Sequence, residues 1–77
     1  MKVWVIKKTL YNARVAATME KAAKIIAEML NEEGYTYTAD GIAEHLQAVI
    51  DDGEAYEWWP VNGVKELVEA QLIEVEG

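Results

Sequence analysis

The residues that could take part in chemistry are few, and they do not form a catalytic set. His45 is the only histidine, and it follows Glu44 directly. A histidine base commonly activates a serine or cysteine nucleophile, but the chain contains neither residue. One histidine also supplies too few nitrogen or sulfur ligands for a zinc site. We therefore expect His45 to be an ordinary surface or boundary residue, and the protein not to be an enzyme.

The acidic residues do not form a metal or acid–base site either. Asp51, Asp52 and Glu54 have the side chains that calcium prefers, but Gly53 follows Asp52 directly, so the spacing of a calcium-binding loop is not met. Glu66 and Glu69 could act as an acid and a base only in a cleft that separates their pKa values, for which a chain of 77 residues has little room. We expect no metal and no cofactor.

The aromatic residues are the best candidates for a binding site. Adjacent residues of a strand point to opposite faces, so Trp58 and Trp59 cannot both enter one core. One indole can fill the core while the other is exposed, covers the second face of the sheet or contacts a partner; alternatively, both simply cover the sheet. Tryptophan and tyrosine are common anchors of protein interfaces. The predicted partner-binding residues are Tyr56, Trp58 and Trp59, together with the acidic residues Asp51, Asp52, Glu54 and Glu57.

The charges are separated along the chain. Residues 1–18 contain four basic residues and no acidic one, whereas residues 35–63 contain six acidic residues and no basic one. The net charge is −7. A protein that binds duplex DNA normally presents a basic stripe to the phosphates, so direct binding of nucleic acid is not expected outside the N-terminal part. The acidic stretch is either a solvated face or a surface that imitates nucleic acid and occupies a basic groove.

The N-terminal part predicts a β-hairpin. Val3–Ile6 is rich in β-branched and aromatic residues without helical spacing, which indicates a strand. Both faces of this run are apolar, which suits a central strand covered on both sides. Leu10–Ala13, with Asn12, predicts a turn, and Arg14–Ala17 would return as a second, antiparallel strand.

The middle of the chain predicts two helices. Thr18 is a suitable N-cap for an amphipathic helix that ends at Gly34. Thr38 or Asp40 caps a second helix, which ends at Gly53. The apolar residues that recur at helical spacing are Met19, Ala22, Ala23, Ile26, Met29 and Leu30 in the first helix, and Ile42, Leu46, Val49 and Ile50 in the second. Residues 35–38 between them are either a strand or an extended connector.

The C-terminal part predicts a further strand. Pro60 argues against a central strand over residues 54–60, and Asn62-Gly63 indicates a turn. Residues 64–75 are predicted to be mostly strand; the alternative is a helix that becomes a strand at Ile73. A strand beside residues 3–8 would place Glu66, Glu69 and Glu74 near Lys2, Lys7 and Lys8, where opposite charges are favourable.

These elements predict an α+β fold in a single domain, residues 1–77, in which a small antiparallel sheet, made of the N-terminal hairpin and the C-terminal strand, packs with two helices. The absence of cysteine favours a reducing cytoplasm. The apolar run at the N-terminus is too short for a signal peptide, and no stretch is long enough to span a membrane.

Residues 2–6, 12, 14–15 and 18–23, which lead into the first helix, resemble the opening of small phage-encoded orphan proteins. In these proteins a β-hairpin runs into a helix, and an acidic strand such as residues 72–76 closes the sheet. Phage inhibitors of host defences, among them the anti-CRISPR proteins, are short, acidic, cysteine-poor and non-enzymatic. The resemblance implies a role in blocking a nucleic-acid-handling complex in the cytoplasm of a host cell.

Residues 37–46 and 67–74 resemble the second helix and the end of the third helix of a winged-helix domain. The chain departs from that pattern because no wing follows Glu74, and because the recognition region would carry Glu54, Glu57, Trp58 and Trp59 in place of arginine and lysine. A winged-helix-like DNA-binding regulator is therefore an alternative. The main prediction is an acidic, protein-binding inhibitor; a homo-oligomeric structural subunit is a third possibility.

Overall fold

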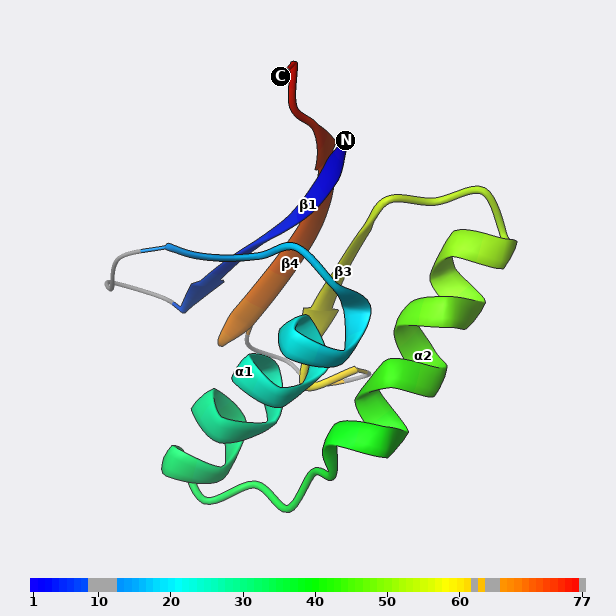
Figure 1. Cartoon of the computed structure of the whole chain (residues 1–77). Coiled ribbons are helices and arrows are strands. Elements are labelled where there is room, and N and C mark those ends of the chain that lie inside the picture. Colours follow the sequence, from blue (N-terminus) through cyan, green and yellow to red (C-terminus); the bar gives the residue numbers. More distant parts are fainter. Residues whose placement is uncertain (9–12, 62, 64–65, 77) are drawn as a thin grey trace.

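The computed structural model describes residues 1–8, 13–61, 63 and 66–76 of the chain. The predicted α+β class is confirmed: two helices pack against one antiparallel sheet of four strands, in the order β2-β1-β4-β3 (Figure 1). The elements are β1 (Lys2–Lys8), β2 (Arg14–Ala16), α1 (Met19–Glu32), α2 (Ala39–Asp51), β3 (Tyr56–Trp59) and β4 (Val68–Glu74). The predicted hairpin and C-terminal strand form three of the strands, and β3 adds the fourth at the edge beside β4.

The two helices cover only one face of the sheet (Figure 1). Because side chains alternate along a strand, every second residue faces the helices. These residues form the core with the apolar sides of α1 and α2, and they are Trp4, Ile6, Ala16, Trp59, Val68 and Ala70. The prediction that β1 is a central strand is confirmed. The prediction that it is covered on both sides is wrong in that no helix lies on its second side, although Val3 on that side is only 8% exposed. We call the side without helices the open face.

A threonine caps each helix, as the sequence predicts. The Thr18 hydroxyl accepts a hydrogen bond from the backbone N–H of Lys21 at 3.2 Å, and the Thr38 hydroxyl accepts one from Gly41 at 3.1 Å. Thr38 is therefore the cap of α2, and Asp40 lies in its first turn. Gly34 and Gly53, which follow the helices, have φ of +92° and +82°, a conformation that glycine adopts without strain.

Residues 35–38 form a connector and not a strand, and Asn31 holds this connector in place. The side-chain amide of Asn31 donates to the carbonyl oxygen of Tyr37 at 3.3 Å and accepts from its N–H at 3.1 Å. These two bonds satisfy the backbone of Tyr37 without a neighbouring strand. The connector is thus fixed to the end of α1 just before α2 begins.

The C-terminal segment is a strand, so the helical alternative is wrong for residues 68–72. Val68 and Ala70 point into the core and Glu69 lies between them, which is the two-residue period of a strand. The winged-helix alternative is also wrong, because it requires the end of a helix here. The predicted turn residues 10–12 and 62 lie outside the described residues, as do residues 64 and 65.

The predicted charge pairing between β1 and β4 is confirmed for two of the three lysines. Lys2 lies opposite Glu74 and Lys7 lies opposite Glu69 in the ladder. Lys8 lies opposite Val68 instead, and its amine forms ion pairs with Glu33 at 2.9 Å and Glu32 at 3.5 Å. The end of β1 is therefore tied to the end of α1.

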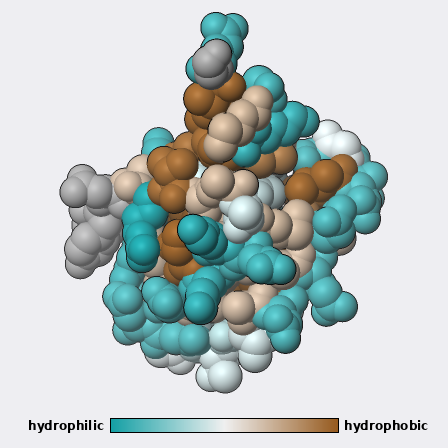
Figure 2. Space-filling model, viewed as in Figure 1, coloured by the Kyte–Doolittle hydropathy of each residue, from teal (hydrophilic) through white to brown (hydrophobic). Residues whose placement is uncertain are grey.

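The visible surface is mostly hydrophilic over the helices, and most of the brown, hydrophobic residues lie higher, around the sheet (Figure 2). Neither helix in the described part of the chain is long and apolar enough to cross a membrane.

Candidate functional site

Strand β3 places its two tryptophans on opposite faces of the sheet. Trp59 is 1% exposed and packs in the core with the helices. Trp58 is half-buried and lies on the open face together with Tyr56, which is 41% exposed. Of the three predicted aromatic anchors, Tyr56 and Trp58 are therefore accessible from the open face. Trp59 is a core residue, and it also lines a pocket described below.

Tyr56 is the centre of a small group of acidic and aromatic side chains on the open face. Its hydroxyl group contacts Glu66 Oε1 at 2.7 Å and Glu69 Oε2 at 2.9 Å. Trp58 lies beside this pair, because it is the ladder partner of Glu69. Lys7 flanks Glu69 on the other side, from β1. We call Tyr56, Trp58, Glu66 and Glu69 the acid–aromatic cluster.

The surroundings of Glu69 favour its negatively charged form. The hydrogen-bonded contact with Glu66 and the hydrogen bond donated by Tyr56 lower the pKa of Glu69 below its ordinary value, and the positive charge of Lys7 acts in the same direction. Burial and the two carboxyl groups raise the pKa of Tyr56 above its ordinary value. Tyr56 therefore keeps its proton and remains a donor, while Glu69 remains a carboxylate at neutral pH.

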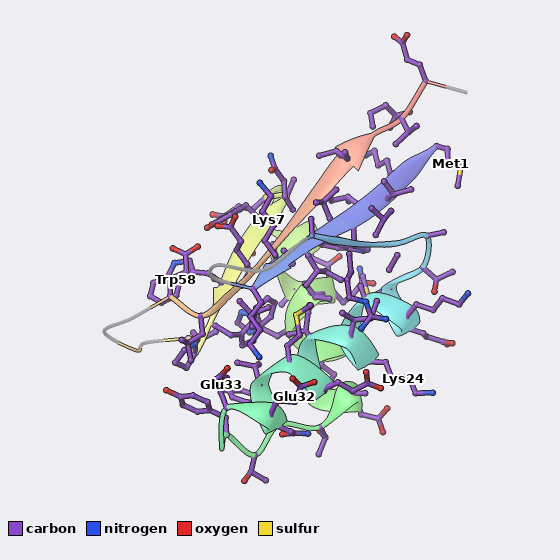
Figure 3. All side chains as sticks on the ribbon, turned by 90° about the vertical axis from the view of Figure 1, so that its left-hand side faces the viewer. Met1, Lys7, Lys24, Glu32, Glu33 and Trp58 are labelled. Atoms are coloured by element: carbon purple, nitrogen blue, oxygen red, sulfur yellow. The ribbon has the colours of Figure 1, made fainter. Side chains whose placement is uncertain are left out.

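The rest of the open face is largely apolar. Val15 is 63% exposed and Ile73 36% exposed, although both lie within strands. Figure 3 shows Lys7 and Trp58 on the side of the sheet away from the helices. The strand residues of the open face are Val3, Val5, Lys7, Val15, Tyr56, Trp58, Glu69, Gln71 and Ile73. This face therefore combines apolar β-branched residues with an acidic, aromatic corner.

The acidic residues predicted as binding residues do not lie in one group. Asp51 ends α2 and accepts a hydrogen bond from Gln47 at 3.0 Å, and Asp52 is the C-cap of the same helix. Glu54 is exposed in the turn that leads to β3. These three acids therefore lie at the end of α2 and in the turn after it, and not in the acid–aromatic cluster. The sequence prediction missed Glu66 and Glu69 as partner-binding residues. The alternation along β4 could have indicated Glu69, because it shares the face of Tyr56.

Glu57, the remaining predicted acid, is turned to the other face and is bound to His45. The His45 Nε2 and Glu57 Oε2 atoms are 2.7 Å apart, and the pair is partly buried. Glu57 Oε1 also accepts the backbone N–H of Trp58 at 2.9 Å. The His45 ring meets the indole of Trp59 edge-on, with the ring centres 5.9 Å apart and the planes at 68°. Sequence spacing does not predict this pairing, because it depends on how α2 crosses β3.

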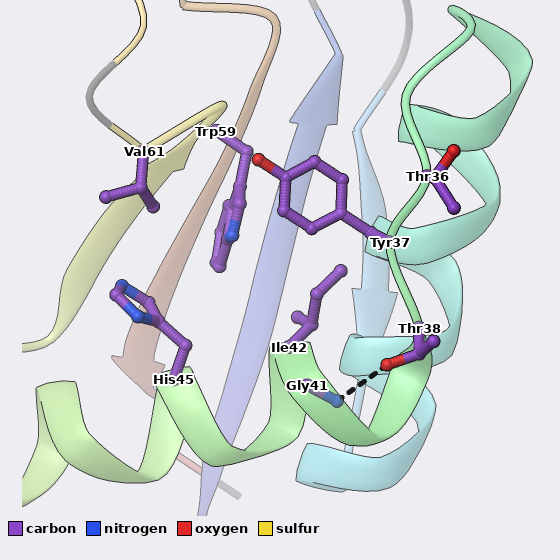
Figure 4. A pocket seen from close by; sticks show the side chains of 8 residues that line it. All are labelled: Thr36, Tyr37, Thr38, Gly41, Ile42, His45, Trp59 and Val61. Carbon is purple, nitrogen blue, oxygen red and sulfur yellow. Dashed lines mark hydrogen bonds between the residues drawn. The ribbon is translucent and has the colours of Figure 1, made fainter.

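A pocket lies beside His45, on the helix side of the sheet. Its volume is about 380 Å³. The connector, the first turns of α2 and the end of β3 form its walls (Figure 4). The lining residues are Thr36, Tyr37, Thr38, Gly41, Ile42, His45, Trp59 and Val61. Within residues 1–8, 13–61, 63 and 66–76, no three histidine or acidic side chains are close enough together to hold a metal ion.

Comparisons with known proteins do not assign the chain to a family. No protein-family model, no curated protein and no solved structure matches it. The open face and the pocket are therefore the features from which we infer a function.

Proposed function

We propose that the chain is a non-enzymatic protein-binding module that docks through the open face of its sheet onto a partner with a basic surface. The observation that carries the proposal is the composition of that face. It exposes valine and isoleucine within regular strands, and it carries Tyr56 and Trp58 next to carboxylates. Isolated exposed apolar residues are common on proteins, but a contiguous apolar sheet face bordered by polar residues is typical of an interaction site.

The acid–aromatic cluster suits an arginine or lysine of the partner. A cation that approaches Trp58 would meet an indole ring and, next to it, the carboxylate of Glu69. The side chain of Tyr56 is already held by Glu66 and Glu69, so little side-chain freedom is lost on binding. These features support Tyr56 and Trp58 as the anchors of the interface.

The partner we propose is a nucleic-acid-handling complex, which the chain would inhibit in the cytoplasm of a host cell, as phage anti-CRISPR proteins do. The support for this finer proposal is the charge distribution. Glu66 and Glu69 lie beside Tyr56 on the open face, and three further acids, Asp51, Asp52 and Glu54, lie at the end of α2 and in the turn that leads to β3. Carboxylates spread around an interface attract the basic groove that normally binds phosphates.

A second candidate function is that of a homo-oligomeric subunit. The observation that favours it is the high exposure of Val15 and Ile73, which a second copy of the chain would bury. Measurement of the molar mass by light scattering over a range of concentrations separates the two candidates, because only self-association raises the mass of the purified protein.

The docking proposal is tested by affinity capture from a nuclease-treated bacterial lysate with four forms of the protein. These are the native chain, Trp58→Ala, Glu69→Lys and, as a matched control, Lys24→Ala on the exposed side of α1. We expect one protein to be retained by the native chain and the control and to be lost with both open-face variants. Retention by all four forms would contradict the proposal. The same capture with the charges of Asp51 and Asp52 reversed then tests separately whether these two acids contribute to binding.

A further inference from the structure

We propose that the pocket beside His45 binds a small, neutral, planar molecule that carries a hydrogen-bond acceptor, such as an aromatic amide. The pocket is lined by residues of the helix side of the sheet, whereas the proposed protein interface is the open face. The two proposals are therefore independent.

The walls of the pocket are held in place by hydrogen bonds. The two hydrogen bonds between Asn31 and the backbone of Tyr37 fix Tyr37, and the bond from the Gly41 N–H to the Thr38 hydroxyl fixes the start of α2. A volume of about 380 Å³ lies at the small end of the range for ligand pockets. A small molecule could thus enter without a rearrangement of the backbone.

The indole N–H of Trp59 points to a ligand. Trp59 is 1% exposed, and its indole nitrogen makes no hydrogen bond with any residue that the structure describes. Across those same residues, no fully buried side-chain nitrogen or oxygen lacks a partner. The small exposed part of Trp59 must therefore include this nitrogen, and Trp59 lines the pocket. This N–H donor therefore opens into the pocket without a protein acceptor, and an acceptor group on a ligand would satisfy it there.

The aromatic rings around this donor favour a flat molecule. Figure 4 shows Trp59 between His45 and Tyr37, with Ile42 below. The indole and imidazole rings form a corner, since their planes lie at 68°. Aromatic rings pack well against each other in offset or edge-on arrangements, which a planar ligand would extend.

The charges around the pocket favour a neutral ligand. Glu57 binds His45 but is not part of the pocket wall, and none of the residues that line the pocket is acidic. A cationic ligand would therefore find no carboxylate in the wall of the pocket. An anionic ligand would be repelled by Glu57 and by the net charge of −7 on the chain. A neutral carbonyl group avoids both costs and still accepts the hydrogen bond of Trp59.

The test uses three probes with the same ring, namely benzamide, benzoate and benzylammonium, and nuclear magnetic resonance of the indole N–H groups. The chain has three tryptophans, so three indole signals are resolved and are assigned with Trp4→Phe and Trp58→Phe. We expect benzamide to shift the Trp59 signal along a saturable curve, and the two charged probes to bind about tenfold more weakly or not at all.

A blocking variant and its control locate the binding. Val61 is half-buried and lines the pocket, and Figure 4 shows its side chain directed toward His45, so Val61→Phe should obstruct the pocket. Gln47→Phe adds the same ring on α2 outside the pocket. We expect the benzamide shift to be lost in Val61→Phe and retained in Gln47→Phe. The inference is overturned if benzamide leaves the Trp59 signal of the native chain unmoved, if all three probes shift it equally, or if a folded Val61→Phe responds like the native chain.

Discussion

Replacement of Trp59 by alanine, compared with the same replacement at Trp58, tests how the two faces of the sheet differ. Trp59 is 1% exposed and is packed in the core. Removal of a buried tryptophan side chain typically costs about 3–5 kcal/mol, since apolar contacts are lost and a cavity remains. Trp58 lies on the open face and is half-buried, and the space it leaves is open to solvent, so we expect a loss of about 1–2 kcal/mol.

The difference is large relative to the stability of the domain. At about 0.05–0.15 kcal/mol per residue, a chain of 77 residues has a free energy of unfolding of about 4–12 kcal/mol. Trp59→Ala should therefore remove about a quarter of it or more. The assay is urea denaturation followed by far-ultraviolet circular dichroism, because both substitutions remove a fluorophore. Equal losses, or a larger loss from Trp58→Ala, would refute the assignment of the two indoles to the two faces.

Three further predictions follow from local contacts. Thr18→Ala and Thr38→Ala should each lower the free energy of unfolding by about 1 kcal/mol, because each removes an N-cap; urea denaturation that detects no loss would contradict this. The pKa of Glu69 is lowered in the folded protein, so the stability that this carboxylate contributes is present above its unfolded pKa of 4.5 and is lost as the pH falls through the folded pKa. Glu69→Gln should therefore reduce the loss of unfolding free energy between neutral and acidic pH. An unchanged pH profile in this variant would contradict the prediction. The pKa of Tyr56 is raised in the folded protein, so the stability that its protonated hydroxyl contributes is present below pH 10.0 and is lost at more alkaline pH. In an ultraviolet titration, Tyr56→Phe should remove the tyrosine signal that ionises at the highest pH. Loss of a signal that ionises at lower pH would show that the raised pKa does not belong to Tyr56.

The candidate site could be predicted only in part from the sequence. The opposite orientation of Trp58 and Trp59 follows from the alternation of a strand, and the structure has this arrangement. Which indole enters the core does not follow from alternation, because it depends on the side of β3 from which α2 approaches. Glu57 and His45 are twelve residues apart, and they meet only because α2 crosses that side. Glu66 and Glu69 join Tyr56 only because β4 pairs with β3.

The sequence by itself determined the local features of this protein. Thr18 and Thr38 cap helices because their hydroxyl groups accept from nearby backbone N–H groups, and the apolar spacing of each helix sets the side that it buries. The tertiary structure alone decided which face of the sheet is covered. β1 is apolar on both faces, so its sequence pattern is compatible with helices packed on either face or on both. Both helices lie on one side, where α1 contacts β1, β2 and β4 while α2 contacts β3 and α1. Two helices of 14 and 13 residues cover one face of a four-stranded sheet and leave the other open, which is where we place the function.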